Sequence, residues 1–233
     1  MSETQRIIAN VTVIQTPAQG EDAGWQFIYA PGAGSHVDDP FGIYTCTTLA
    51  AQGVSSTRFQ FPYQEARSRR PDRPAVLQET WLGVLDSVRR SGLRTVIGGR
   101  SMGGRVATMI VAGGASVDGL VPFAYPLHQP GHPENARVGH LPDIKSPSLF
   151  VSGTRDTFGT PDDLTDAVGL VKGAQLRWLD GADHGFAVLK HSNRTKDEVY
   201  REAVDALADW AKKTLSAHLP DDDPRRGLGL LDG

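Results

Sequence analysis

The sequence contains very little cysteine and no long apolar run. Cys46 is the one cysteine among 233 residues, so it can form no internal disulfide and supplies no cluster of zinc ligands. We expect it to be a small buried side chain. No apolar run approaches the roughly 20 residues that a membrane-spanning helix needs. The segment Met1–Arg6 also lacks the basic-then-apolar order of a signal peptide, so we expect a cytoplasmic protein with no membrane span.

The sequence also lacks an excess of positive charge. A formal net charge of -3 gives no electrostatic case for binding nucleic acid. Hydrophobic residues make up 39% and charged residues 22%, which is enough for a core and too polar for a membrane protein. We expect one enzyme-sized domain over residues 1–217. The polar residues 218–233 are expected to form a mobile tail, although Leu228, Leu230 and Leu231 could instead dock on the body or on a second subunit of a homodimer.

Segments typical of strands alternate with segments typical of helices. The spacing of Leu77, Trp81 and Val84 is helical, with one buried face. Strands are expected at residues 7–14 (one strand or two), 25–29, 54–61, from 95, 119–124, 148–152 and 175–179, and helices at 40–53, at 75–91, after 101, from 160 and from 195. This alternation predicts an α/β fold with a mostly parallel central sheet and helices on both faces.

One stretch has the form of a strand, an abrupt turn and a helix. Its centre, Gly99–Gly103, matches the pattern Gly-x-Ser-x-Gly, with Ser101 in the middle. A turn of this kind lifts the serine out of the backbone at the carboxyl end of a strand. Gly99 and Gly103 are expected to be required because a Cβ at either position would clash. The following helix would direct the partial positive charge of its amino end at the site.

Two further strands are expected to end in residues that can assist this serine. Functional groups gather at the carboxyl ends of the strands in a parallel sheet. Ser101 needs a base to act as a nucleophile, and His184 can take up and return a proton near neutral pH. Asp156 would hold the other ring nitrogen of His184 and stabilise the imidazolium. Ser101, Asp156 and His184 are therefore candidates for a catalytic triad.

An acyl-transfer site also needs N–H donors for the developing oxyanion. The backbone N–H of Met102, directly after Ser101, is one candidate. The second is the N–H of Ala33, in the loop after the expected strand 25–29, where Gly32 and Gly34 would let a substrate approach the backbone closely. His36, which follows this loop, and His128, in a loop rich in proline and histidine, are candidates for substrate contact.

Each candidate also has a structural interpretation. Ser101 could cap a helix, Asp156 could cap a turn or pair with Arg155, and His184 could be an ordinary loop histidine. The coincidence of their order and their positions at strand ends favours the catalytic interpretation.

The arginines of one segment, and Arg100 separately, each allow two interpretations of their role. Those in the segment 67–73 could bind an anionic group of a substrate or form a solvated loop. Arg100 could flank the pocket or form a buried ion pair beneath the turn.

The sequence resembles the α/β-hydrolase superfamily, and within it the small dienelactone-hydrolase-like group, up to about residue 215. Pro31–Ser35, Gly98–Gly104, Phe150–Asp156 and Gly181–Phe186 carry the resemblance, while Phe59–Tyr63 and Tyr125–His128 match a branch of predicted hydrolases. Two departures stand out. Dienelactone hydrolases proper use a cysteine where this chain has Ser101, and many relatives have a histidine where it has Pro31.

Together these features predict a serine hydrolase that cleaves carboxylic ester or thioester bonds of a small acyl substrate. The reaction would pass through an acyl-enzyme that water releases, so no cofactor and no metal is expected. The segment between the Ser101 helix and Asp156 is too short for a large lid domain, which predicts a rather open site. The alternative, from another class, is a hydrolase-fold scaffold that binds a partner and performs little catalysis.

Overall fold

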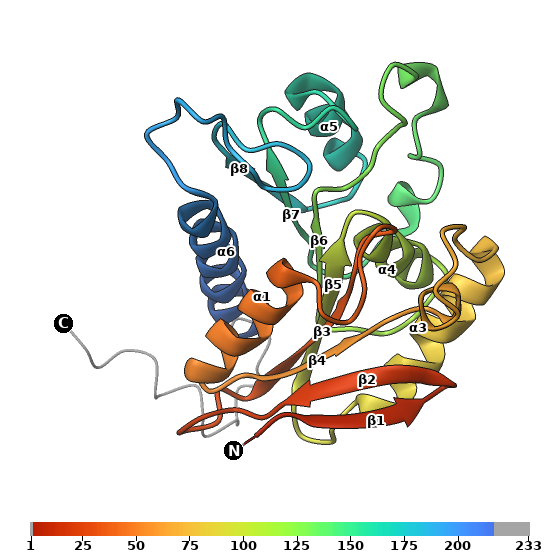
Figure 1. The fold of residues 1–233 in the computed structure, drawn as a ribbon, viewed down its shortest axis with the longest axis vertical. Coiled ribbons are helices and arrows are strands. Elements are labelled where there is room, and N and C mark those ends of the chain that lie inside the picture. Colours follow the sequence, from red (N-terminus) through yellow and green to blue (C-terminus); the bar gives the residue numbers. More distant parts are fainter. Residues whose placement is uncertain (1, 217–233) are drawn as a thin grey trace.

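The computed structural model describes residues 2–216, in which eight strands form one sheet (Figure 1). Their order is β1-β2-β4-β3-β5-β6-β7-β8. The strands are β1 (Thr4–Ile8), β2 (Val11–Thr16), β3 (Trp25–Ala30), β4 (Ser55–Phe59), β5 (Arg94–Arg100), β6 (Gly119–Phe123), β7 (Leu149–Gly153) and β8 (Gln175–Leu179). All neighbours from β4 to β8 pair in parallel, whereas the pairs β1–β2 and β2–β4 are antiparallel. The predicted α/β class with a mostly parallel sheet is confirmed.

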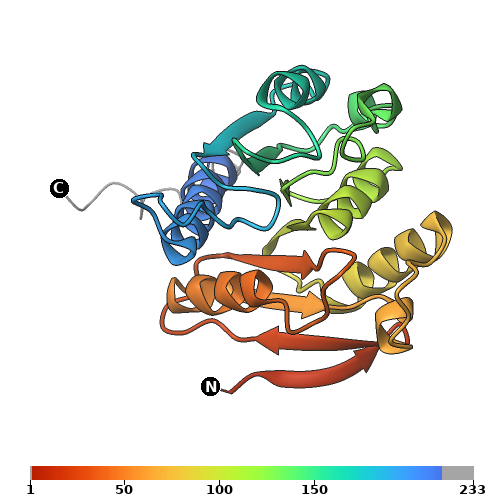
Figure 2. The same ribbon diagram turned by 45° about the horizontal axis from the view of Figure 1, so that its top comes forward.

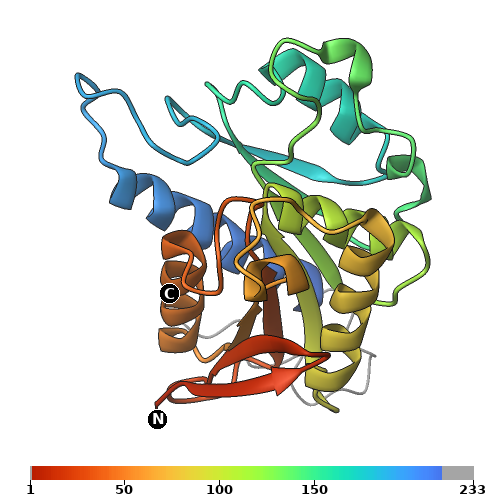
Figure 3. The same cartoon turned by 45° about the vertical axis from the view of Figure 1, so that its right-hand side comes forward.

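Helices cover both faces of this sheet, as predicted. On one face lie α1 (Pro40–Ala51) and α6 (Lys196–Ser216), and on the other α3 (Pro74–Val88), α4 (Met102–Ala112) and α5 (Pro161–Gly169). Figure 3 shows α1 and α6 on one side of the strands and α3 and α4 on the other. Each face has its own apolar cluster, built around Trp81 and Ile110 on the α3–α4 side and around Phe41 and Trp210 on the α1–α6 side.

The amino-terminal segment 7–14 is two strands, which decides between the two sequence-based alternatives. Its turn consists of Ala9 and Asn10, with φ angles of 50° and 62°. Two consecutive residues with positive φ are typical of the tight hairpin turn whose twist matches that of the strands. The hairpin adds β1 and β2 to the edge of the sheet beside β4.

The observed starts of the helices agree with the sequence-based predictions better than their ends do. Asp39 accepts the backbone N–H of Gly42 at 3.0 Å, so it caps α1 as expected. The predicted helix 75–91 ends earlier, at Val88, because the backbone of Arg89 is extended. A short helix that the sequence did not predict, α2 (Pro62–Glu65), follows β4.

Cys46 is buried in α1, as predicted, and burial raises the pKa of its thiol to about 12. Within residues 2–216, no helix is both long and apolar enough to cross a membrane. The expected tail 218–233 lies outside the described residues. One domain over residues 1–217 stays a prediction.

Candidate active site

Ser101 lies at the junction of β5 and α4 in a backbone conformation that is rare for a residue with a side chain. Its φ is 51° and its N–H donates to the carbonyl of Phe123 at 2.8 Å. A Cβ placed on Gly99 or on Gly103 would lie 2.3 Å from the carbonyl oxygen of Ala30. The predicted need for two glycines is thus confirmed, and the end of β3 is the neighbour that imposes it.

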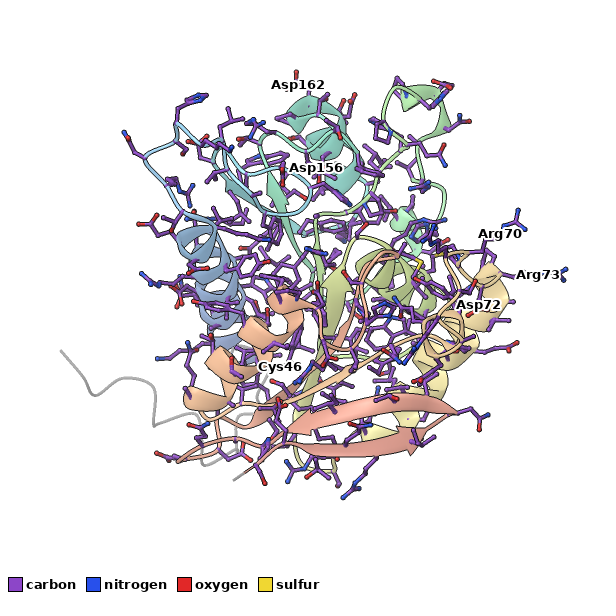
Figure 4. All side chains as sticks on the ribbon, viewed as in Figure 1. Cys46, Arg70, Asp72, Arg73, Asp156 and Asp162 are labelled. Atoms are coloured by element: carbon purple, nitrogen blue, oxygen red, sulfur yellow. The ribbon has the colours of Figure 1, made fainter. Side chains whose placement is uncertain are left out.

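The structure brings the three predicted triad residues together. Asp156 follows β7, where Figure 4 labels it, and His184 follows β8. Nε2 of His184 lies 2.8 Å from Oγ of Ser101, and Nδ1 lies 2.8 Å from Oδ2 of Asp156. The Asp156 side chain is 3% exposed and that of His184 23%. A buried carboxylate holds one side of the imidazole, while the other side stays open to a reacting group.

The hydrogen bonds that link Asp156, His184 and Ser101 define the tautomer of His184. A carboxylate only accepts, so Nδ1 carries the proton and Nε2 is left to accept the serine hydroxyl. Oδ1 of Asp156 accepts the backbone N–H of Phe158 at 2.8 Å, which holds the carboxylate in place. The serine is therefore poised to lose its proton to the ring.

Phe158 is a site residue that sequence reasoning missed. Its ring stacks on that of His184, with centroids 4.0 Å apart and an angle of 26° between the planes. The stacking limits rotation of the imidazole. The available signal was an aromatic residue two positions after Asp156, in a loop otherwise made of small and polar residues.

The loop Pro31–Ser35, called here the oxyanion loop, lies against Ser101. A Cβ placed on Gly32 would be 3.5 Å from the Cβ of Ser101. The carbonyl of Gly32 accepts Nε2 of Gln64 at 3.1 Å. Because the C=O and N–H of one peptide unit point in opposite directions, this bond turns the N–H of Ala33 away from Gln64. The N–H of Met102, in the first turn of α4, has no helical partner.

Two side chains from α2 fix the oxyanion loop, and neither was predicted. Gln64 also donates to the carbonyl of Ser35, and the Tyr63 hydroxyl donates to the carbonyl of Ala33 at 2.7 Å. Burial raises the pKa of Tyr63 to about 12, so the phenol stays a donor. The short length of α2 explains why no sequence pattern marked these contacts.

Arg100 forms an ion pair beneath the oxyanion loop, which decides between its two alternatives. Its Nη2 lies 3.3 Å from Oδ1 of Asp39 and 3.1 Å from Oγ of Ser35. Asp39 also accepts the Tyr29 hydroxyl at 2.5 Å. The pair ties the loop to the start of α1.

The remaining sequence candidates lie in two different places. Ala33, Gly34 and His36 line a cleft of about 910 Å³ on the side of the oxyanion loop, and no triad residue lines it. His128 lies instead in a separate pocket of about 280 Å³ against α5, where its Nε2 is 3.8 Å from Oδ2 of Asp163. Contact of His36 with a substrate stays a prediction, and the structure places His128 away from that cleft.

A comparison with known protein families matches most of the chain. A family model described as an alpha/beta hydrolase domain matches residues 23–212. The chain belongs to the α/β-hydrolase family. The match spans the oxyanion loop, Ser101, Asp156 and His184, so all the residues described above lie inside the family's domain.

Solved structures share the fold at low identity. An alpha-beta serine hydrolase homologue from Coxiella burnetii is 18% identical with a TM-score of 0.70, covering 88% of this chain and 97% of the other. A serine hydrolase without a lid from Xanthomonas campestris is 15% identical with a TM-score of 0.67, covering 90% and 94%. Dienelactone hydrolase from Anabaena variabilis is 18% identical with a TM-score of 0.64, covering 94% and 99%. The α/β-hydrolase fold therefore accounts for nearly the whole chain.

Proposed function

We propose that this α/β-hydrolase cleaves carboxylic ester or thioester bonds, with Ser101, His184 and Asp156 as its catalytic triad. The observation that carries the proposal is the pair of 2.8 Å contacts joining Ser101 to His184 and His184 to Asp156. Three residues from three separate strand ends meet in the arrangement that activates a serine hydroxyl.

In the proposed reaction, Oγ of Ser101 attacks the substrate carbonyl carbon while its proton moves to Nε2 of His184. The carbonyl oxygen becomes an oxyanion, bound by the N–H groups of Met102 and Ala33. Each such donor is typically worth about 3 kcal/mol of transition-state stabilisation. Collapse of the intermediate expels the alcohol or thiol, which takes the proton from His184. Water then attacks the acyl-enzyme by the same route in reverse.

The surroundings of the site favour small or extended substrates over deeply buried lipids. Between α4 and β7 the chain forms only β6 and two short helical turns, at Pro133–Asn135 and Leu141–Asp143. The large cleft beside the oxyanion loop is lined mainly by polar side chains, among them Gln60, Gln64 and Arg67. A long alkyl chain would find little apolar surface there, because favourable burial scales with apolar area.

Hydrolysis of p-nitrophenyl acetate by the wild type and by Ser101→Ala tests the proposal. We expect the wild type to turn over the ester and the variant to lose at least about 10³-fold in kcat, because the nucleophile is gone. The thermal unfolding temperature should change little, since the variant removes only the hydroxyl that bonds to the partly exposed ring of His184. Turnover that persists in Ser101→Ala would exclude Ser101 as the nucleophile. A folded wild type with no turnover of any acyl ester would favour the scaffold alternative.

A further inference from the structure

The cleft of about 910 Å³ adjoins the oxyanion loop directly. Ala33 and Gly34 belong to the loop and also line the cleft, and so do most residues of the segment Tyr63–Arg69. A substrate with its carbonyl at the N–H of Ala33 therefore has the cleft within reach of its remaining atoms. This inference rests on the proposed function, because it concerns the substrate of the same site.

Two arginines that line the cleft have no partner within the described residues. Of the three carboxylates that line the cleft, Asp39 forms an ion pair with Arg100 and Glu65 accepts the N–H of Thr12, while the exposed Asp38 acts only through its charge on Arg58, which is itself paired with Glu3. By contrast, the guanidinium groups of Arg67 and Arg69 have no hydrogen bond or ion pair to any residue in the described range 2–216, and both residues are exposed. An anion entering the cleft would meet two free guanidinium groups.

The backbone of Arg67 gives a second, independent indication. Its φ is 52°, in the left-handed region, where it ends α2. Its backbone N–H donates to the carbonyl of Gln64 at 3.0 Å, and the N–H of Ser68 donates to the carbonyl of Tyr63 at 2.8 Å. These two bonds form a Schellman motif. Glycine is the usual residue at this point, since any side chain there is strained. Here an arginine bears the strain although its charge has no partner in the described chain, an outlier that motivates a functional hypothesis for this position.

We propose that Arg67 and Arg69 bind an anionic group of the substrate, a carboxylate or a phosphate, in the cleft beside the oxyanion loop. A planar guanidinium offers paired N–H donors that match both kinds of oxyanion. The site selects substrates that carry this group at a distance from the scissile carbonyl. Arg70 and Arg73 do not line the cleft and point outward from the molecule (Figure 4).

Two matched pairs of substrates distinguish the sources of the anion. The first pair is mono-p-nitrophenyl succinate and p-nitrophenyl butyrate, whose acyl groups have the same number of carbons and differ by a carboxylate in place of the terminal methyl. The second is acetyl-coenzyme A and S-acetylpantetheine, which differ by the phosphorylated adenosine nucleotide on the leaving thiol. The quantity of interest in each pair is the ratio of kcat/KM for the anionic member to that for the neutral member.

The test compares two double variants that remove the same amount of charge. Arg67→Asn with Arg69→Gln removes the cleft arginines, and asparagine tolerates the left-handed backbone. Arg70→Gln with Arg73→Gln is the control. We expect the first variant to lower the ratio about tenfold for at least one pair and the control to leave both ratios unchanged. Raising the salt concentration should lower the wild-type ratio in the same way, by screening.

The outcomes separate this inference from the proposed function. A fall in the succinate ratio assigns the subsite to a carboxylate, and a fall in the coenzyme A ratio assigns it to a phosphate. If the cleft variant keeps both wild-type ratios while still hydrolysing the neutral substrates, the anion site is wrong and the hydrolase proposal stands. If the folded wild type hydrolyses none of the four substrates, the proposed function itself fails.

Discussion

At the residue scale, Asp156 uses its two carboxylate oxygens for different partners. One accepts from the His184 ring and the other from the backbone N–H of Phe158, each at 2.8 Å. The carboxylate can therefore not rotate without losing both contacts. Phe158 then returns to the same ring as a stacked partner. The imidazole is held along its edge by Asp156 and across its face by Phe158.

The variant Asp156→Asn is predicted to lose activity while keeping its fold. The side-chain oxygen of the asparagine would still accept the hydrogen bond from the N–H of Phe158. Its NH₂ group would therefore face Nδ1 of His184. The ring would then carry its proton on Nε2 and could not accept the Ser101 proton. We expect kcat for p-nitrophenyl acetate to fall by about 10³ to 10⁴ near pH 7.5, with KM little changed. A loss smaller than about tenfold would show that Asp156 does not orient the base.

Individual catalytic candidates could be predicted from the sequence because few residue types do this chemistry. Ser101, Asp156 and His184 each follow an expected strand, and the structure places their side chains in contact. Gln64 and Phe158 could not be found in the same way. Their contribution depends on packing between distant segments, and amide and aromatic side chains occur at many other positions with no such role.

At the element scale, the turn between β5 and α4 depends on its closeness to the end of β3. Strands β3 and β5 are neighbours, with Ala30 beside Gly99. The first turn of α4 then passes the same carbonyl, so both glycines face one backbone atom. The oxyanion loop continues from this strand end, so backbone contacts set the spacing between Ser101, the proposed nucleophile, and the proposed oxyanion donors.

The variant Gly103→Ala is predicted to be strongly destabilised. The added methyl would lie 2.3 Å from the Ala30 carbonyl and 2.5 Å from that of Pro31, and neither backbone atom can move cheaply. We expect the free energy of unfolding to fall by at least about 2 kcal/mol, measured by urea denaturation.

Gly169→Ala provides the control for this prediction. A Cβ there meets nothing within 4 Å, and the residue ends a helix, so stability should be unchanged or slightly raised. Equal stability of the two variants would contradict the account of the turn.

At the scale of the whole molecule, the strands β3 to β8 run parallel in one twisted sheet (Figures 1, 2 and 3), so the segments that follow β3, β5, β7 and β8 lie at the same end of it. Its strand order does not follow the sequence, because β4 lies between β2 and β3. The alternation of elements predicted a parallel sheet with helices on both faces. It could not predict the order, since similar apolar strands fit several neighbours and packing of the whole sheet decides among them.

The loss of folding stability at low pH is predicted to depend in part on His140. Burial, and then the charge of Arg105, lower the pKa of His140 below its ordinary value of 6.5. The unfolded chain therefore binds a proton more readily than the native one, and stability falls as the pH drops below about 6.5. The loss continues until the pH passes the lowered native value.

We expect His140→Gln to lose less stability than the wild type between about pH 7.5 and pH 5, measured by thermal unfolding. Glutamine can still donate to Oγ of Thr108, which lies 2.8 Å from Nε2 of His140. The control is His191→Gln, at an exposed position, which should follow the wild type. Identical pH profiles for His140→Gln and the wild type would contradict this assignment.

The central claim, that Ser101 is an activated nucleophile, is tested most directly by covalent labelling. The wild-type protein is treated with a fluorophosphonate and digested, and the modified residue is located by mass spectrometry. We expect one phosphonylated peptide carrying the adduct on Ser101, and strongly reduced labelling in Asp156→Asn, where the base would hold its proton on the wrong nitrogen. A folded wild type that stays unlabelled at Ser101 would contradict the assignment of Ser101 as nucleophile. Equal labelling of the wild type and of Ser101→Ala would contradict it as well.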